Sequence, residues 1–160
     1  MSYVQALWRG VDRDRYEDRA PLESSHPFFG RLAHYDAEHD GEGHWEALLS
    51  HPRTGERFTV CLPGGRLTPL QPYANAYRRL VAGPDALLAR CRAALREEVD
   101  VHRGDGPATR ASDFVLEGVI LPAEGREDGA WRAHYVAEPS GRRLTACFEG
   151  TLVRKVVLDD

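Results

Sequence analysis

The 160-residue sequence has no run of about 18 apolar residues, the length that a membrane-spanning helix requires. Its first residues also lack the basic head and apolar core of a secretory signal. Both absences predict a cytoplasmic protein with no membrane partner.

The sequence also lacks a strong excess of charge of either sign. Its 21 basic residues nearly balance 25 acidic ones, and the net charge is −4. A nucleic-acid-binding protein usually carries a concentrated basic face, so we expect no nucleic-acid partner. Lys155 is the only lysine. The preference for arginine indicates a GC-rich, bacterial genome.

Cysteine is scarce, and several motifs that define chemistry are absent. Three widely spaced cysteines form neither a disulfide framework nor a Cys-x-x-Cys metal knuckle, so we expect reduced, buried thiols. No Gly-x-Gly-x-x-Gly, phosphate loop or Gly-x-Ser-x-Gly elbow occurs. The sequence therefore supports neither nucleotide binding nor covalent catalysis, and we expect no cofactor.

A block of about twenty residues occurs twice, at 45–64 and 131–150. Without a gap, the identical pairs are Trp45/Trp131, Ala47/Ala133, Gly55/Gly141, Arg57/Arg143, Thr59/Thr145, Cys61/Cys147 and Gly64/Gly150. Either the chain contains a duplicated β unit, or two hairpins have similar sequences by coincidence. The ungapped register favours duplication and two pseudo-symmetric halves of one sheet.

Each block has the pattern of a β-hairpin. Apolar and polar residues alternate along the second arms, and successive side chains of a strand point to opposite faces. The apolar rows are Phe58, Val60 and Leu62 in one block and Leu144, Ala146 and Phe148 in the other. Proline followed by glycine separates the arms, as in a tight turn.

Between the blocks, apolar residues recur at helical spacing over about 70–82 and about 84–99. The sequence therefore predicts the α+β class. We expect a single antiparallel sheet of about six to seven strands built from two similar β units, about 26–65 and 112–151. The two helices are inserted between the units and pack on one face. We expect one domain over 1–160, in which residues 1–25 form a partly irregular N-terminal segment.

A strand with Phe29, Gly30, Leu32 and Tyr35 precedes a polar loop and the Trp45 hairpin. The second half has a similar order and ends in Phe148-Glu149-Gly150. This pattern resembles a family of uncharacterised bacterial domains, some members of which are similar to immunity proteins of toxin systems. The resemblance implies a small cytoplasmic binding protein and transfers no catalytic residue.

The loop around residues 34–44 is rich in metal-binding side chains. His34, His39 and His44 are candidate metal ligands, because imidazole and carboxylate groups bind divalent ions. The spacing matches no known metal motif, and a solvated turn is the alternative. The corresponding loop at 122–129 has acidic residues but no histidine, so the fold does not require these histidines.

The polar rows of the two hairpins predict a second candidate site. Its residues are Arg57, Arg143, Thr59, Thr145 and Glu149. If a pseudo-twofold relates the two halves, this face presents paired arginines to an acidic protein partner or to a second copy in a homodimer. An ordinary solvated sheet face is the alternative.

Two functions follow from these candidate sites. The first is a non-enzymatic protein-interaction module, immunity-like, that acts by occluding another protein. The second is a small metal-dependent enzyme that uses the loop with His34, His39 and His44.

Overall fold

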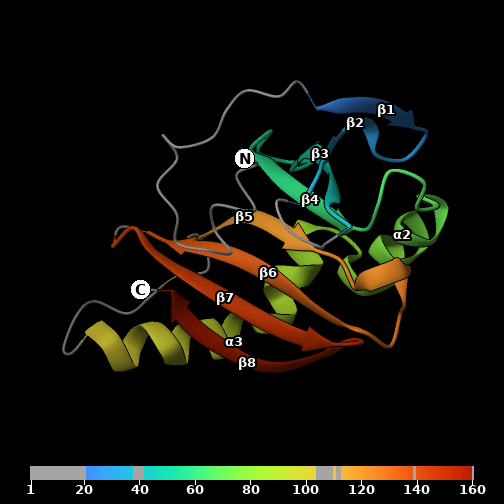
Figure 1. The fold of residues 1–160 in the computed structure, drawn as a ribbon. Coiled ribbons are helices and arrows are strands. Elements are labelled where there is room, and N and C mark those ends of the chain that lie inside the picture. The colour runs from blue at the N-terminus through green and yellow to red at the C-terminus, as the bar shows by residue number, and fades with distance from the viewer. Residues whose placement is uncertain (1–20, 38–41, 104–109, 111–112, 139, 160) are drawn as a thin grey trace.

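The computed structural model describes residues 21–37, 42–103, 110, 113–138 and 140–159 (Figure 1). The strands are β1 (Leu22–His26), β2 (Gly30–Tyr35), β3 (His44–Ser50), β4 (Arg57–Pro63), β5 (Phe114–Ile120), β6 (Ala130–Ala137), β7 (Arg142–Glu149) and β8 (Leu152–Asp159). The helical segments are α2 (Gln71–Ala76), the π-helix η2 (Tyr77–Val81), α3 (Pro84–Arg103) and the short η4 (Ala123–Gly125).

The eight strands form one sheet in chain order, from β1 to β8. Neighbouring strands are antiparallel except β4 and β5, which are parallel. A parallel neighbour requires a long crossover connection, and residues 64–113 with their helices provide it. The α+β class is confirmed, but the prediction of a purely antiparallel sheet of six to seven strands was wrong. Strand β1 was not predicted.

The two tryptophan-led hairpins, β3–β4 and β6–β7, pair in the same register. Matching cross-strand pairs are Trp45↔Leu62 with Trp131↔Phe148, and Ala47↔Val60 with Ala133↔Ala146. Trp45 donates its indole N–H to the Gly65 carbonyl at 3.2 Å, and Trp131 donates to the Gly150 carbonyl at 2.7 Å. Duplication itself stays a prediction, since β8 has no counterpart in the first half, where residues 66–73 lead into α2.

The direction of the strands shows how the two hairpins are related. Because β4 and β5 are parallel and their other neighbours are antiparallel, β5, β6 and β7 run in the same directions as β2, β3 and β4. The second set therefore lies three strands farther along the sheet, about 14 Å at the usual strand spacing. The second set of strands is therefore related to the first by a sideways displacement along the twisted sheet. A pseudo-twofold axis perpendicular to the sheet would reverse the strand directions, so the hypothesised pseudo-twofold does not exist.

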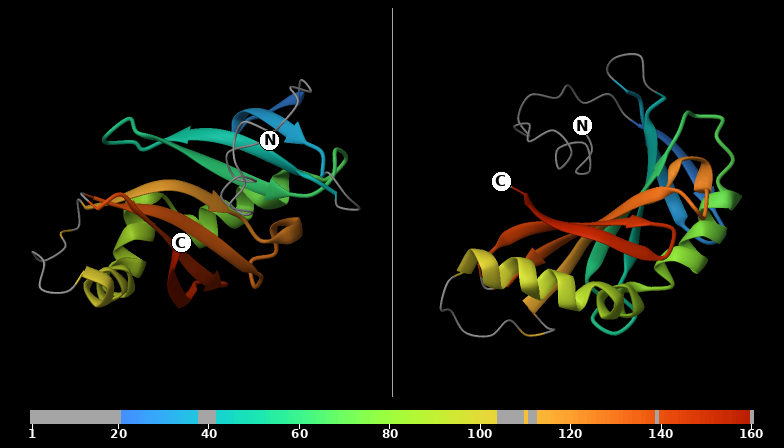
Figure 2. Two further views of the ribbon diagram at one scale, coloured as in Figure 1. Left: turned by 60° about the vertical axis from the view of Figure 1, so that its left-hand side comes forward. Right: turned by 90° about the horizontal axis from the view of Figure 1, so that it is seen from below.

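One face of the sheet, here called the inner face, packs against the helices. The apolar rows predicted for the second arms are buried there, as expected. Helix α3 buries Leu87, Cys91, Leu95 and Val99, and it lies chiefly beside β7 and β8 (Figure 2). Each buried leucine stabilises the fold by about 1.5–3 kcal/mol before conformational entropy is subtracted.

The helical region differs in detail from the prediction. The predicted helix 70–82 is α2 followed by the π-helix η2, and Ala82, the residue after η2, has a φ of 60°. Helix α3 begins at Pro84, as expected, and extends four residues beyond the predicted end at 99. Among the described residues, no helix is both long and apolar enough to cross a membrane.

Candidate functional site

The opposite face of the sheet, here called the outer face, has a groove over β2, β3 and β4. Its volume is about 670 Å³. The outer-face side chains that line it include Ala33, Tyr35, Glu46, Leu48, Arg57 and Thr59. They reach one face because strand residues alternate, and cross-strand pairs such as Leu48↔Thr59 align them. We call this cavity the outer groove.

A ring stack and a polar side-chain contact hold one end of the outer groove in place. The Tyr35 ring stacks on the His44 ring, with centroids 5.6 Å apart. His44 Nε2 lies 2.9 Å from Glu46 Oε1. Burial, and then the charge of Glu46, raise the pKa of the Tyr35 hydroxyl. The Tyr35 hydroxyl is therefore uncharged at neutral pH, and its ring forms a fixed aromatic side of the groove.

The other end of the outer groove carries apolar surface and positive charge. Leu48 is 53% exposed, which is unusual for a leucine in a central strand. Arg57 is exposed and makes no ion pair with any described residue. Arg31, which also lines the groove, is instead paired with Glu23. Arg57 therefore supplies the uncompensated positive charge of this groove.

The outer groove has no activated nucleophile among its described residues. Cys61, which faces the same side of the sheet and lies opposite Glu46, is 2% exposed. Burial, and then the charge of Glu46, raise the pKa of its thiol well above the usual value. A thiol with a raised pKa is a poor nucleophile at neutral pH.

Two of the five predicted binding residues, Arg57 and Thr59, line the outer groove. The other three lie in the second half of the sheet and make local contacts there. Thr145 is buried 2.9 Å from the His134 ring, Arg143 pairs with Glu117 at 3.2 Å, and Glu149 pairs with Arg154. The structure therefore does not bring the two predicted arginines together, because their hairpins are displaced along the sheet.

Sequence reasoning missed Tyr35, Glu46 and Leu48. The first arm of each hairpin alternates as the second does, so the same rule placed Glu46 and Leu48 on the outer face. Tyr35 follows from pairing, since it lies opposite His44 in the neighbouring strand.

The predicted histidine ligands are only partly described. His34 lies on the inner face and its Nε2 is 3.1 Å from the Gly64 carbonyl oxygen. His44 lies on the outer face beside Glu46, so these two histidines point to opposite sides of the sheet. His39 lies outside the described residues. Within the described part of the chain, no group of three histidine, cysteine or acidic side chains is placed to hold a metal ion.

No protein-family model, curated protein or solved structure matches this chain. The resemblance to bacterial domains with immunity-like members stays a prediction. The geometry of the site is therefore the basis for assigning a function.

Proposed function

We propose that the protein is a non-enzymatic interaction module that binds an acidic segment of a protein partner in the outer groove. The observation that supports this most directly is the exposed Arg57 beside the half-exposed Leu48 on an otherwise ordered sheet face.

The composition of the outer groove is that of a protein-binding surface. Tyrosine and arginine are enriched at the positions that dominate binding energy, and a central apolar contact is typically surrounded by polar groups. Tyr35 and Leu48 provide the apolar contact, and Thr59, which pairs with Leu48 across the strands, adds a hydroxyl beside it. A carboxylate of the partner is the natural counterion for a guanidinium without one.

The groove itself is smaller than a stable interface, which buries about 800 Å² on each partner. It therefore forms the centre of a larger contact, with the surrounding outer face as its rim. Occlusion of a partner requires only such a contact and no chemical step. An immunity-like role is the biological setting that the resemblance in sequence suggests.

Selection of peptides on the immobilised full-length chain tests the proposal. We expect a random displayed library to yield sequences enriched in aspartate and glutamate around an apolar residue. Arg57→Gln should weaken the selected peptide about tenfold, because one charge-assisted contact is lost. Leu48→Asp should abolish binding.

The internal similarity supplies a matched control. Arg143 is the residue that corresponds to Arg57 in the second hairpin, and it lies outside the groove. Arg143→Gln should leave peptide affinity unchanged. Equal losses in the two variants, or selected peptides without acidic residues, would overturn the proposal. A dimer in sedimentation experiments that Leu48→Asp dissociates would instead identify a second copy of the chain as the partner.

A further inference from the structure

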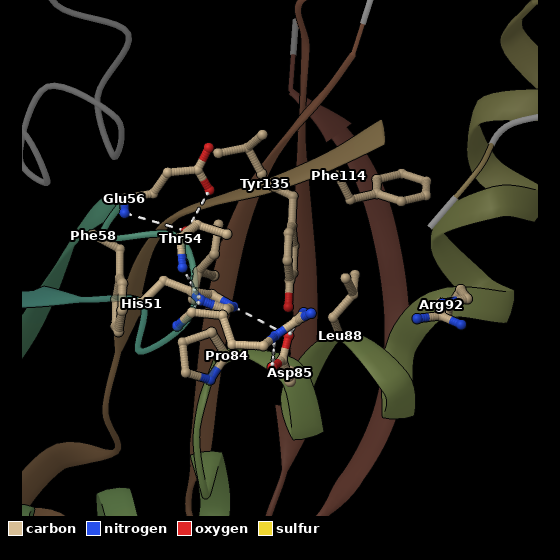
Figure 3. Close-up of a pocket in the computed structure, with 13 residues that line it drawn as sticks. His51, Thr54, Glu56, Phe58, Pro84, Asp85, Leu88, Arg92, Phe114 and Tyr135 are labelled. Atoms are coloured by element: carbon tan, nitrogen blue, oxygen red, sulfur yellow. Dashed lines mark hydrogen bonds and ion pairs between the residues drawn. The ribbon is translucent and has the colours of Figure 1, made fainter. Parts of the chain in front are cut away.

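A second cavity lies on the inner face, where the β3–β4 turn, the first turns of α3, and strands β5 and β6 meet (Figure 3). Its volume is about 500 Å³. Ligand-binding cavities usually measure about 300–1,000 Å³, so this one is large enough for a small organic molecule. We call it the inner cavity. It is separate from the outer groove, which lies across the sheet.

The walls of the inner cavity are mostly apolar. They consist of Phe58 from β4, Leu88 from α3, Phe114 and Leu116 from β5, and Tyr135 from β6. Helix α3 packs chiefly against β7 and β8, and the cavity lies between its first turns and β5. A bulge between Leu116 and Gly118 interrupts the pairing of β5 in the same region.

The polar residues at the turn end of the inner cavity satisfy one another. Arg53 donates from Nε and Nη2 to the two carboxylate oxygens of Asp85, at 2.9 and 2.7 Å. His51 Nε2 is 3.1 Å from Asp85 Oδ1. The hydrogen bond from Arg53 holds the pKa of Asp85 below its usual value, so this carboxylate stays charged and paired. These groups close one end, where the Arg53 cation is paired and Glu56 accepts a hydrogen bond from the Thr54 hydroxyl, so no cation there is left for a ligand.

Arg92 does not take part in this hydrogen-bonded network. It follows Leu88 by one helical turn and lines the same cavity. Its Nε atom is buried without a hydrogen-bond partner, and the side chain makes no ion pair with any described residue. Arg92 as a whole is half-buried, but a buried donor such as its Nε is costly when it has no acceptor. An anionic group in the cavity would remove that cost.

We infer that the inner cavity binds a small apolar organic anion, such as a carboxylate with an aromatic or branched aliphatic body. The body occupies the space between Phe58, Leu116 and Tyr135. The anionic group accepts hydrogen bonds from the Arg92 guanidinium, a geometry that arginine and carboxylate groups favour. This ligand site is independent of the outer groove.

Two fluorescent probes with the same aromatic body test the inference on the full chain. One is 1-anilinonaphthalene-8-sulfonate, an anion, and the other is the neutral N-phenyl-1-naphthylamine. We expect both to bind at one site per chain. Arg92→Gln should weaken the anionic probe about tenfold and leave the neutral probe unchanged, because only the charge contact is lost.

Arg96 provides a matched control on the same helix. Its Nε is also buried without a partner, but the residue does not line the inner cavity. Arg96→Gln should leave both probes unchanged, whereas Leu88→Trp should fill the cavity and weaken both. Melting temperatures and circular dichroism confirm that each variant is folded.

Two results would overturn the inference. One is equal loss of the anionic probe in the Arg92 and Arg96 variants. The other is no saturable binding of either probe to the folded wild-type chain. Neither result bears on the outer groove, because Arg57→Gln is measured with a different ligand on the opposite face.

Discussion

The hydroxyl group of Tyr73 connects the two halves of the sheet, and its removal is a sharp test of the fold. Tyr73 lies in α2 and is fully buried. Its hydroxyl donates to the carbonyl of Pro63, at the end of β4, and accepts the backbone N–H of Glu124, in η4, at 3.0 Å. Tyr73→Phe removes the oxygen atom and leaves the ring in place.

The expected cost follows from the two groups that lose their partner. A buried donor or acceptor without a partner costs about 1–3 kcal/mol. Pro63 is half-buried and Glu124 is exposed, so water reaches part of the gap. We therefore expect a loss of about 2 kcal/mol in the free energy of unfolding. For a chain of this length that corresponds to a fall of about 4–8 °C in melting temperature.

Tyr77 is the matched control. It lies one helical turn after Tyr73, it is 7% exposed, and its hydroxyl has no hydrogen bond to a described residue. Tyr77→Phe should therefore change stability at neutral pH by only a few tenths of a kcal/mol. Urea unfolding followed by tryptophan fluorescence measures both variants. If Tyr73→Phe is no less stable than Tyr77→Phe, the connecting role assigned to the Tyr73 hydroxyl is wrong.

Three further predictions follow from backbone strain and burial. Gly125→Ala should cost about 3 kcal/mol in thermal unfolding, because a Cβ there would lie 2.6 Å from backbone of α2 and φ is +67°. Gly141→Ala has a similar φ of +68° but open space, so it should cost only about 1 kcal/mol; equal costs would contradict the clash. Burial raises the pKa of Tyr77 to about 12, so between pH 10 and 12 the unfolded chain loses this proton first and the protein loses stability as pH rises. Tyr77→Phe should reduce that loss in urea titrations, and an unchanged alkaline profile would refute the shift. Cys91 is fully buried and burial raises the pKa of its thiol, so mass spectrometry should show iodoacetamide labelling only after unfolding, and rapid labelling of the native chain would contradict this.

Local pattern was enough to predict most individual elements. Alternation along 57–62 and 143–148 identified both second arms and the inward residues of each, and the structure buries these rows. The stripe that begins at Leu87 identified α3 and its buried side. These predictions succeeded because the period of a strand or helix is a property of adjacent residues.

The local sequence pattern does not determine how the two halves of the sheet pair with each other. The wrong prediction of an antiparallel sheet and the wrong prediction of paired arginines both come from this. The hairpins predicted antiparallel neighbours within each half, but the long helical connection allowed β5 to lie parallel to β4. That choice displaces Arg143 sideways from Arg57, so the predicted arginine pair does not form. Thr145 hydrogen-bonds to His134 because the two residues are directly opposite within the β6–β7 hairpin.

By itself the sequence determined which segments form strands and helices and which side of each is apolar, because those properties repeat over a few residues. Only the tertiary structure decided which strands are neighbours and where helix and sheet fail to fill the space between them. Both the outer groove and the inner cavity depend on contacts between residues far apart in the chain. Arg57 and Arg92 therefore acquire their significance from what surrounds them, since charge without a nearby counterion is a property of the folded arrangement.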